Sequence, residues 1–144
     1  MKLGADGDRA YVAKFFGPEK EDTGTMRWSH AESLLKLPVN SKTAYAVALD
    51  LRIPDQAVDS ANGVYLGTER IIDLAGKTGI VAASGTIPPQ DQDRVILSVR
   101  VKAWRPKDTI PDSKDGRQLG VAVRAVTMKA EGSPAPEFNA NTGG

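Results

Sequence analysis

The chain contains no cysteine and a single histidine, His30. Without the sulfur, disulfide bonds, thiolate zinc sites, iron–sulfur clusters and a cysteine nucleophile are all excluded. A histidine-rich metal site is excluded as well, and a Ser-His-Asp triad would have to use His30. No Gly-x-Ser-x-Gly elbow accompanies this residue, because the nearest glycine and serine run, at 83–86, lacks the spacing. We therefore expect no catalytic role for His30.

Neither sign of charge dominates the sequence. Lysine and arginine number 19 against 18 aspartates and glutamates, which gives a net charge of +1. A chain so balanced has no basic field to attract a phosphate backbone or an anionic membrane surface. No apolar run approaches the roughly 20 residues of a spanning helix, and the polar start at 1–8 lacks the apolar core of a signal peptide. We expect no nucleic-acid partner and no direct membrane insertion, and the chain is either cytosolic or an excised piece of a longer protein.

Glycine-rich nucleotide-binding loops are also lacking. The sequence has neither Gly-x-x-x-x-Gly-Lys-Ser/Thr nor a dinucleotide fingerprint. We expect no cofactor of this or any other kind. A length of 144 residues suits one domain. The small, polar, breaker-rich composition of 1–9 and 132–144 predicts a linker or disorder at the start and a flexible tail at the end, around one domain at 10–131.

What the chain does have is apolar and polar residues alternating in short runs, separated by Gly, Pro, Asn and Asp. This alternation is typical of strands with one face in a core. It is clearest at 44–53, where every second residue from Tyr45 to Ile53 is apolar and bulky. Further strands are predicted at 11–16, 26–28, 33–37, 63–66, 71–74, 79–83, 94–104 and 119–128. About eight short strands predict an all-β antiparallel sandwich, of which jelly-roll and immunoglobulin-like forms are the common versions.

One segment also allows a helical turn. Ser29 is followed three residues later by Glu32, the pattern of a helix-capping box. No window of eleven residues carries a helical stripe, so strands remain the preferred interpretation.

Five short motifs occur in a recognisable order. They are Phe16-Gly17-Pro18-Glu19, then Arg27-Trp28, a run ending in Leu35-Lys36-Leu37-Pro38, Trp104-Arg105-Pro106, and Asp115-Gly116-Arg117-Gln118-Leu119-Gly120-Val121-Ala122-Val123. Together they span about residues 10–130. The set resembles the extracytoplasmic, jelly-roll β-sandwich domain attached to bacterial membrane glycosyltransferases and other polysaccharide-assembly proteins. One departure is Trp104-Arg105-Pro106, which stands where such domains often carry an aromatic-rich F-x-P and is followed by a longer polar loop at 107–116.

The resemblance implies a carbohydrate-binding-like accessory domain, periplasmic or at the cell surface, that recognises or positions glycans and is not an enzyme. Membrane segments and transferase chemistry would lie elsewhere in a longer chain, and the membrane-embedded part is a possible partner. An indole face stacks on a pyranose ring, and a guanidinium holds carboxylates, phosphates or hydroxyls. The predicted ligand-binding residues are Trp28, Trp104, Arg27, Arg117 and Glu19.

Other interpretations of the same residues stay open. Glu19 can pair with Arg27 or Arg117 and tie the first loop to the last hairpin, in a structural or protein-interaction domain without a sugar ligand. Exposed rings beside unpaired arginines favour sugar binding, whereas buried indoles and a closed Glu19 pair favour the structural role.

Acidic residues on the loops allow two further functions. A small glycoside hydrolase needs two carboxyl groups about 5–10 Å apart across a cleft. Asp108, Asp112 and Asp115 lie on one loop and can supply oxygens to a calcium ion, although their spacing matches no EF-hand. We expect no metal site.

Overall fold

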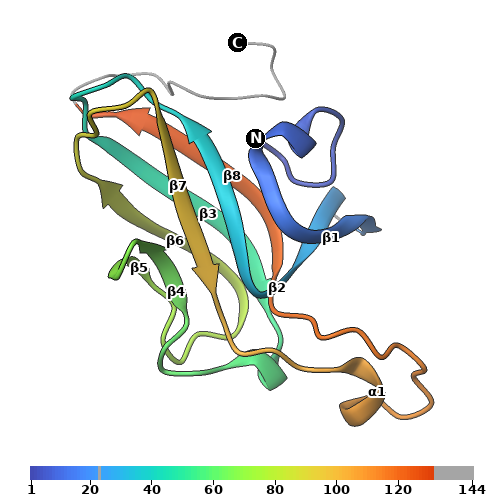
Figure 1. Ribbon diagram of the computed structural model, residues 1–144. Coiled ribbons are helices and arrows are strands. Elements are labelled where there is room, and N and C mark those ends of the chain that lie inside the picture. The colour runs from blue at the N-terminus through green and yellow to red at the C-terminus, as the bar shows by residue number, and fades with distance from the viewer. Residues whose placement is uncertain (23, 132–144) are drawn as a thin grey trace.

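The computed structural model describes residues 1–22 and 24–131. These residues form an all-β structure of antiparallel strands with three one-turn helical segments, so the predicted fold class is confirmed (Figure 1). The strands are β1 (Val12–Glu21), β2 (Gly24–Pro38), β3 (Tyr45–Ile53), β4 (Gly63–Leu66), β5 (Glu69–Asp73), β6 (Gly79–Ile87), β7 (Arg94–Arg100) and β8 (Ala122–Ala130). The helical segments are η1 (Asp8–Tyr11), η2 (Asp55–Ala57) and α1 (Pro106–Thr109).

The strands form one sheet that curls until its ends meet. Their order is β5-β4-β7-β2-β8-β3-β6, and β1 pairs with β2. β5 and β6, the two ends of this order, lie side by side (Figure 1), so the sheet is nearly closed and resembles a barrel or a sandwich. A side-chain carbon at Gly85 of β6 would collide with the backbone oxygen of Ile71 in β5. Gly85 therefore permits the close approach that brings the two ends together.

The predicted alternation builds the core. In β3 the apolar positions Tyr45, Val47, Leu49, Leu51 and Ile53 are each at most 1% exposed. Each such side chain contributes about 1.5–3 kcal/mol by leaving water. Aliphatic residues from the other strands complete one main hydrophobic cluster.

The first nine residues differ from the predicted linker. Met1 and Leu3 are buried, and the Leu3 backbone N–H donates to the Arg124 oxygen at 2.9 Å while the Val126 N–H donates to the Met1 oxygen at 2.8 Å. Met1 and Leu3, with one residue between them, thus extend the sheet beside β8. Their burial offsets the entropic cost of ordering a glycine-rich segment. The predicted tail at 132–144 lies outside the described residues.

Two other boundaries differ from the sequence expectation. β2 runs without a break through 29–35, so the capping-box pattern at Ser29 starts no helix; from Glu32 onward β2 pairs with β7 instead. β7 ends at Arg100, and an isolated bridge between Trp104 and Leu119 closes the loop that carries α1.

Candidate functional site

Arg27 is buried where η1 meets the β1–β2 hairpin. Its Nε and Nη2 donate to Asp8 Oδ2 and Oδ1 at 2.6 and 2.9 Å, and its Nη1 donates to the Phe16 carbonyl at 3.1 Å. The Gly4 backbone N–H donates to the same carboxylate at 2.8 Å. Arg27 thus joins three chain segments, and its partner is Asp8 instead of Glu19.

Arg117 forms the second arginine centre. Its Nη1 donates to Glu19 at 3.0 Å, which confirms the ion pair that the sequence allowed. It also holds Asp115 in a fork of side-chain hydrogen bonds, and its carbon Cζ lies 5.2 Å from the centre of the Phe16 ring. The donated bonds from the Arg117 side chain and backbone N–H lower the pKa of Asp115, and the pKa of Arg117 is raised mainly by its bond to Asp115. Both groups stay charged at neutral pH.

The two tryptophans meet edge to face. Their ring centres are 5.7 Å apart at an angle of 72°. Trp28 is only 7% exposed, because Trp104 covers one side and the Arg52 guanidinium lies 5.4 Å from its ring centre. Trp104 is half-buried, and its Nε1 donates to the Gly120 oxygen at 2.9 Å. Trp28 offers no open face for stacking, whereas Trp104 retains exposed surface.

Two grooves of about 530 Å³ each share Trp28 and Arg52 in their walls. One continues along the β1–β2 hairpin past Glu19, Glu21 and Ile80. The other is more apolar and is lined by Trp104 and Ile110, with polar groups of Asp55, Gln56 and Thr78. We call the second one the tryptophan groove.

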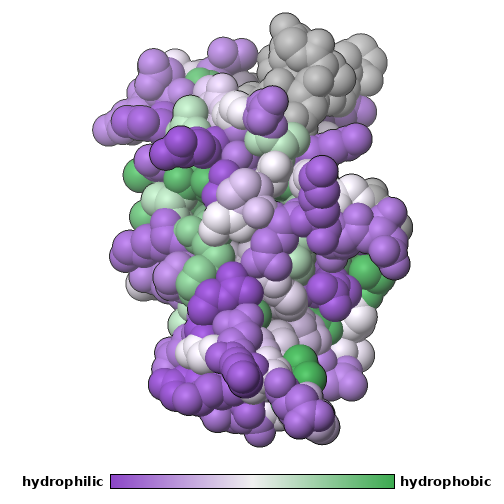
Figure 2. Space-filling view, turned by 90° about the vertical axis from the view of Figure 1, so that its right-hand side faces the viewer, coloured by the Kyte–Doolittle hydropathy of each residue, from purple (hydrophilic) through white to green (hydrophobic). Residues whose placement is uncertain are grey.

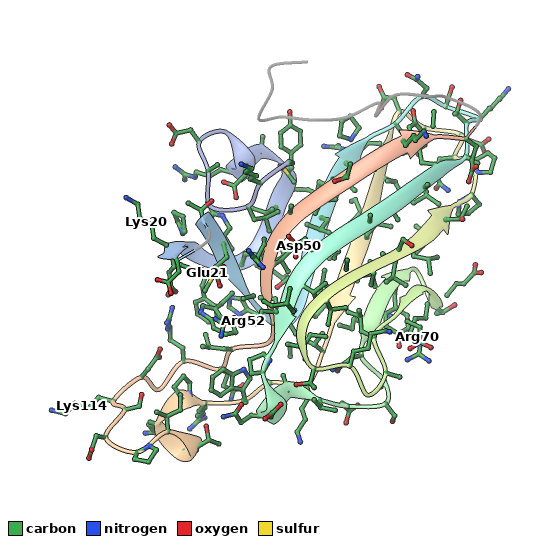
Figure 3. All side chains as sticks on the ribbon, turned by 180° about the vertical axis from the view of Figure 1, so that it is seen from behind. Lys20, Glu21, Asp50, Arg52, Arg70 and Lys114 are labelled. Atoms are coloured by element: carbon green, nitrogen blue, oxygen red, sulfur yellow. The ribbon has the colours of Figure 1, made fainter. Side chains whose placement is uncertain are left out.

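A charge network that the sequence reasoning missed borders these grooves. Glu21 of β1 contacts Arg52 at 3.5 Å and Arg124 at 3.2 Å, and Arg124 lies 3.7 Å from Asp50. Figure 3 shows Glu21, Arg52 and Asp50 in one region between β1 and β3, while Lys20 points away. Sequence reasoning missed Arg52 because its neighbours in this network come from strands that are far apart in the sequence. The only signal was that Arg52 is a polar residue near the end of the clearest predicted strand.

His30, Asp115 and Glu19, which were considered from the sequence, are engaged in packing or in ion pairs. His30 stacks flat on Phe16, with ring centres 4.2 Å apart and planes at 5°. Asp115 is held by Arg117, and within residues 1–22 and 24–131 no group of three or more His, Asp or Glu residues is arranged to hold a metal ion. Glu19 and Glu21 line one groove, and each forms an ion pair there, Glu19 with Arg117 and Glu21 with Arg124.

The structure therefore brings all five predicted binding residues to one end of the molecule. Arg27, Glu19 and Arg117 make ion pairs there and Trp28 is buried, so Trp104 is the tryptophan that presents accessible surface to a groove. Comparison of the chain with family models, curated proteins and solved structures finds no match. Within the described part, no helix is long and apolar enough to span a membrane.

Proposed function

We propose that this chain is a non-catalytic accessory domain that recognises or positions a glycan, outside the cytoplasm, for a larger membrane-associated protein. The observation that carries the proposal is the tryptophan groove. It combines an accessible indole, Trp104, with a guanidinium, Arg52, and with short polar side chains. Sugar sites combine an apolar platform with a few convergent polar groups in this way.

The groove changes which residues we assign to the ligand. Arg27 donates its hydrogen bonds to Asp8, and Arg117 donates to Asp115 and Glu19. They act as positioning residues that hold the β1–β2 hairpin. Arg52 is better placed for a ligand, since its side chain is 42% exposed and its contact with Glu21 is long, at 3.5 Å.

The test is binding to an array of bacterial polysaccharides, followed by titration with each glycan that is retained. Arg52→Gln should weaken binding by about tenfold, the effect of losing one charge-assisted hydrogen bond. Arg100→Gln is the matched control, because Arg100 is similarly exposed, pairs with Glu32 and lies over Tyr65. Equal effects of the two substitutions, or no retained glycan at millimolar concentration, would contradict the proposal.

A second candidate, a protein-interaction domain, is favoured by the edge at the start of β6 around Ile80, away from Gly85, where β6 meets β5. Among the described residues β6 pairs only with β3, and its sequence from Gly79 to Ile87 carries no charge. Ile80 on this strand is 65% exposed. Natural edge strands usually carry charges or proline, so an uncharged edge suits addition of a strand from another chain.

Sedimentation at rising concentration tests this second function for the simplest partner, another copy of the chain. A self-associating chain should become monomeric with Ile80→Lys. Ile96→Lys is the control, because Ile96 is also exposed but lies on β7, which pairs on both sides with β2 and β4. A chain that stays monomeric at every concentration would rule out self-association through β6.

A further inference from the structure

A third groove lies on the other part of β1, away from the tryptophans. It has a volume of about 590 Å³ and is lined by Arg9, Lys14 and Arg27 together with Val12, Phe15 and Pro18. No carboxylate lines it. We call it the basic groove, and it shares no residue with the tryptophan groove.

Irregular pairing of β1 opens this groove. The register with β2 shifts between Ala13 and Phe15 and again between Phe15 and Pro18. Lys14, at the first shift, has a φ of 61°, in the left-handed region that a lysine adopts at an energetic cost. The Ser33 hydroxyl donates to the Lys14 carbonyl at 2.6 Å and holds the bulge in place. The chain thus accepts backbone strain in a conformation that leaves Lys14 exposed at the groove.

Two of the three cations that line the basic groove, Arg9 and Lys14, are not neutralised by an acid within the described part of the chain. Asp8 precedes Arg9 in the sequence, and both its oxygens are bound to Arg27, which lines the groove. The side chains of Arg9 and Lys14 are exposed and form no ion pair within the described part of the chain. Most other arginines near β1 do form one: Arg52, Arg117 and Arg124 contact acids. Arg9 and Lys14 therefore line a groove in which the third cation, Arg27, is already paired with Asp8.

We propose that the basic groove binds a phosphate group. Two unpaired cationic side chains at one hollow suit a compact oxyanion with several acceptor oxygens. Arg9 and Lys14 supply the donors, while Arg27 is held by Asp8 and the Phe16 carbonyl and shapes the wall of the groove. The side of the molecule that carries β1 is mostly hydrophilic (Figure 2), which suits an anionic ligand better than an apolar partner. The proposal does not depend on glycan binding in the tryptophan groove.

Inorganic phosphate is the first probe, titrated by heteronuclear NMR at low, constant ionic strength. We expect saturable shift changes at Arg9 and the bulge of β1, with a dissociation constant on the order of 1 mM. Because the donors are exposed, raising the salt to physiological strength should weaken binding severalfold. The double variant Arg9→Gln with Lys14→Gln should weaken it by at least about tenfold.

The matched control is Arg94→Gln with Lys42→Gln. It removes the same charge from exposed residues, and Lys42 has the same left-handed backbone, with a φ of 60°. Phosphate binding should persist in this control. Lys14→Gly serves as the second test variant, because glycine relieves the strain and removes the whole side chain with its ammonium. It should fold normally and bind phosphate more weakly.

Vesicles that contain phosphatidylglycerol distinguish the source of the phosphate. Vesicle binding that is lost with Arg9→Gln and Lys14→Gln assigns a lipid headgroup, and phosphate binding without vesicle binding assigns a soluble phosphate ester. The proposal is overturned if wild-type spectra do not change with phosphate, or if the double variant and its control lose binding equally.

Discussion

The two arginine centres beside β1 make the same kind of contact in very different surroundings. The Arg27 and Asp8 side chains are 9% and 2% exposed, whereas those of Arg117 and Glu19 are 39% and 38% exposed. Each arginine holds a carboxylate in a fork and also reaches Phe16, through a hydrogen bond or over its ring. The two centres make the same kinds of contact, so they differ mainly in how far their side chains are exposed to water.

That difference sets how costly each centre is to break. When an exposed pair loses one partner, water solvates the other, and such pairs contribute about 0–1 kcal/mol. A buried pair has no such replacement, because the remaining charge stays in a poorly solvated place. The buried centre should therefore control folding of the β1–β2 end, and the exposed centre should only adjust it.

Asp8→Ala is expected to cause the largest loss of stability. It leaves the Arg27 guanidinium buried without a carboxylate, so the free energy of unfolding should fall by about 3–5 kcal/mol. Urea denaturation followed by tryptophan fluorescence measures this loss. Asp6→Ala is the control, since Asp6 is exposed in the same segment and its loss should change stability by less than about 0.5 kcal/mol. Similar losses in both variants would show that Asp8 is not buried as described.

Replacing both members of the buried pair sharpens the comparison. Asp8→Leu with Arg27→Met removes the stranded charge along with its partner, and apolar replacements of buried ion pairs are often well tolerated. We expect this double variant to be at least about 2 kcal/mol more stable than Asp8→Ala. A double variant no more stable than Asp8→Ala would contradict this expectation. It would mean that the hydrogen bond from Arg27 to the Phe16 carbonyl, which the double variant lacks, contributes more than the stranded charge costs.

The strands were the predictable part of this structure. Period-two burial in β3 follows directly from its sequence, since Tyr45 and Ile53 bracket an unbroken alternation. The barrel-like closure was not predictable, because it depends on Gly85 meeting Ile71 across the two ends of the sheet. No local pattern in the sequence reports a contact between those strands.

The candidate site was predictable only where charge complementarity was visible between motifs. The Glu19–Arg117 pair followed from two charged motifs at the ends of strands. Asp8 was missed because it lies among glycines, in a segment whose composition predicts a linker. The signal that could have found it is the apolar spacing of Met1 and Leu3, which is that of a short strand and brings Asp8 into the fold.

Glu19→Gln tests the exposed centre and should have a much smaller effect. Arg117 keeps its bonds to Asp115 and gains water, so the loss of stability should be about 0.2–1 kcal/mol. The loss should shrink as salt is added, because exposed charges are screened. Urea denaturation at low and at high salt measures both effects. A loss as large as that of Asp8→Ala would remove the distinction between the two centres.

Asp115→Asn should have the smallest effect, and its pH dependence identifies the cause. Because Arg117 lowers the pKa of Asp115 in the folded state, ionised Asp115 contributes stability above the ordinary aspartate pKa of about 3.9. That contribution is lost as the pH falls through the lower, folded-state pKa. At pH 6 the variant should be less stable than the wild type by ~0.5 kcal/mol at most. As the pH is lowered from 6 towards 2 and Asp115 takes up its proton, the urea midpoints should approach each other.

Asp112→Asn is the control for this last measurement. Asp112 is exposed on the same loop in the left-handed region, at a φ of 64°, a conformation that asparagine also tolerates. Its substitution should leave the difference between the midpoints at pH 6 and pH 2 unchanged. If Asp112→Asn and Asp115→Asn changed that difference equally, the acid sensitivity would come from the net charge of the loop and not from the fork that Arg117 forms with Asp115.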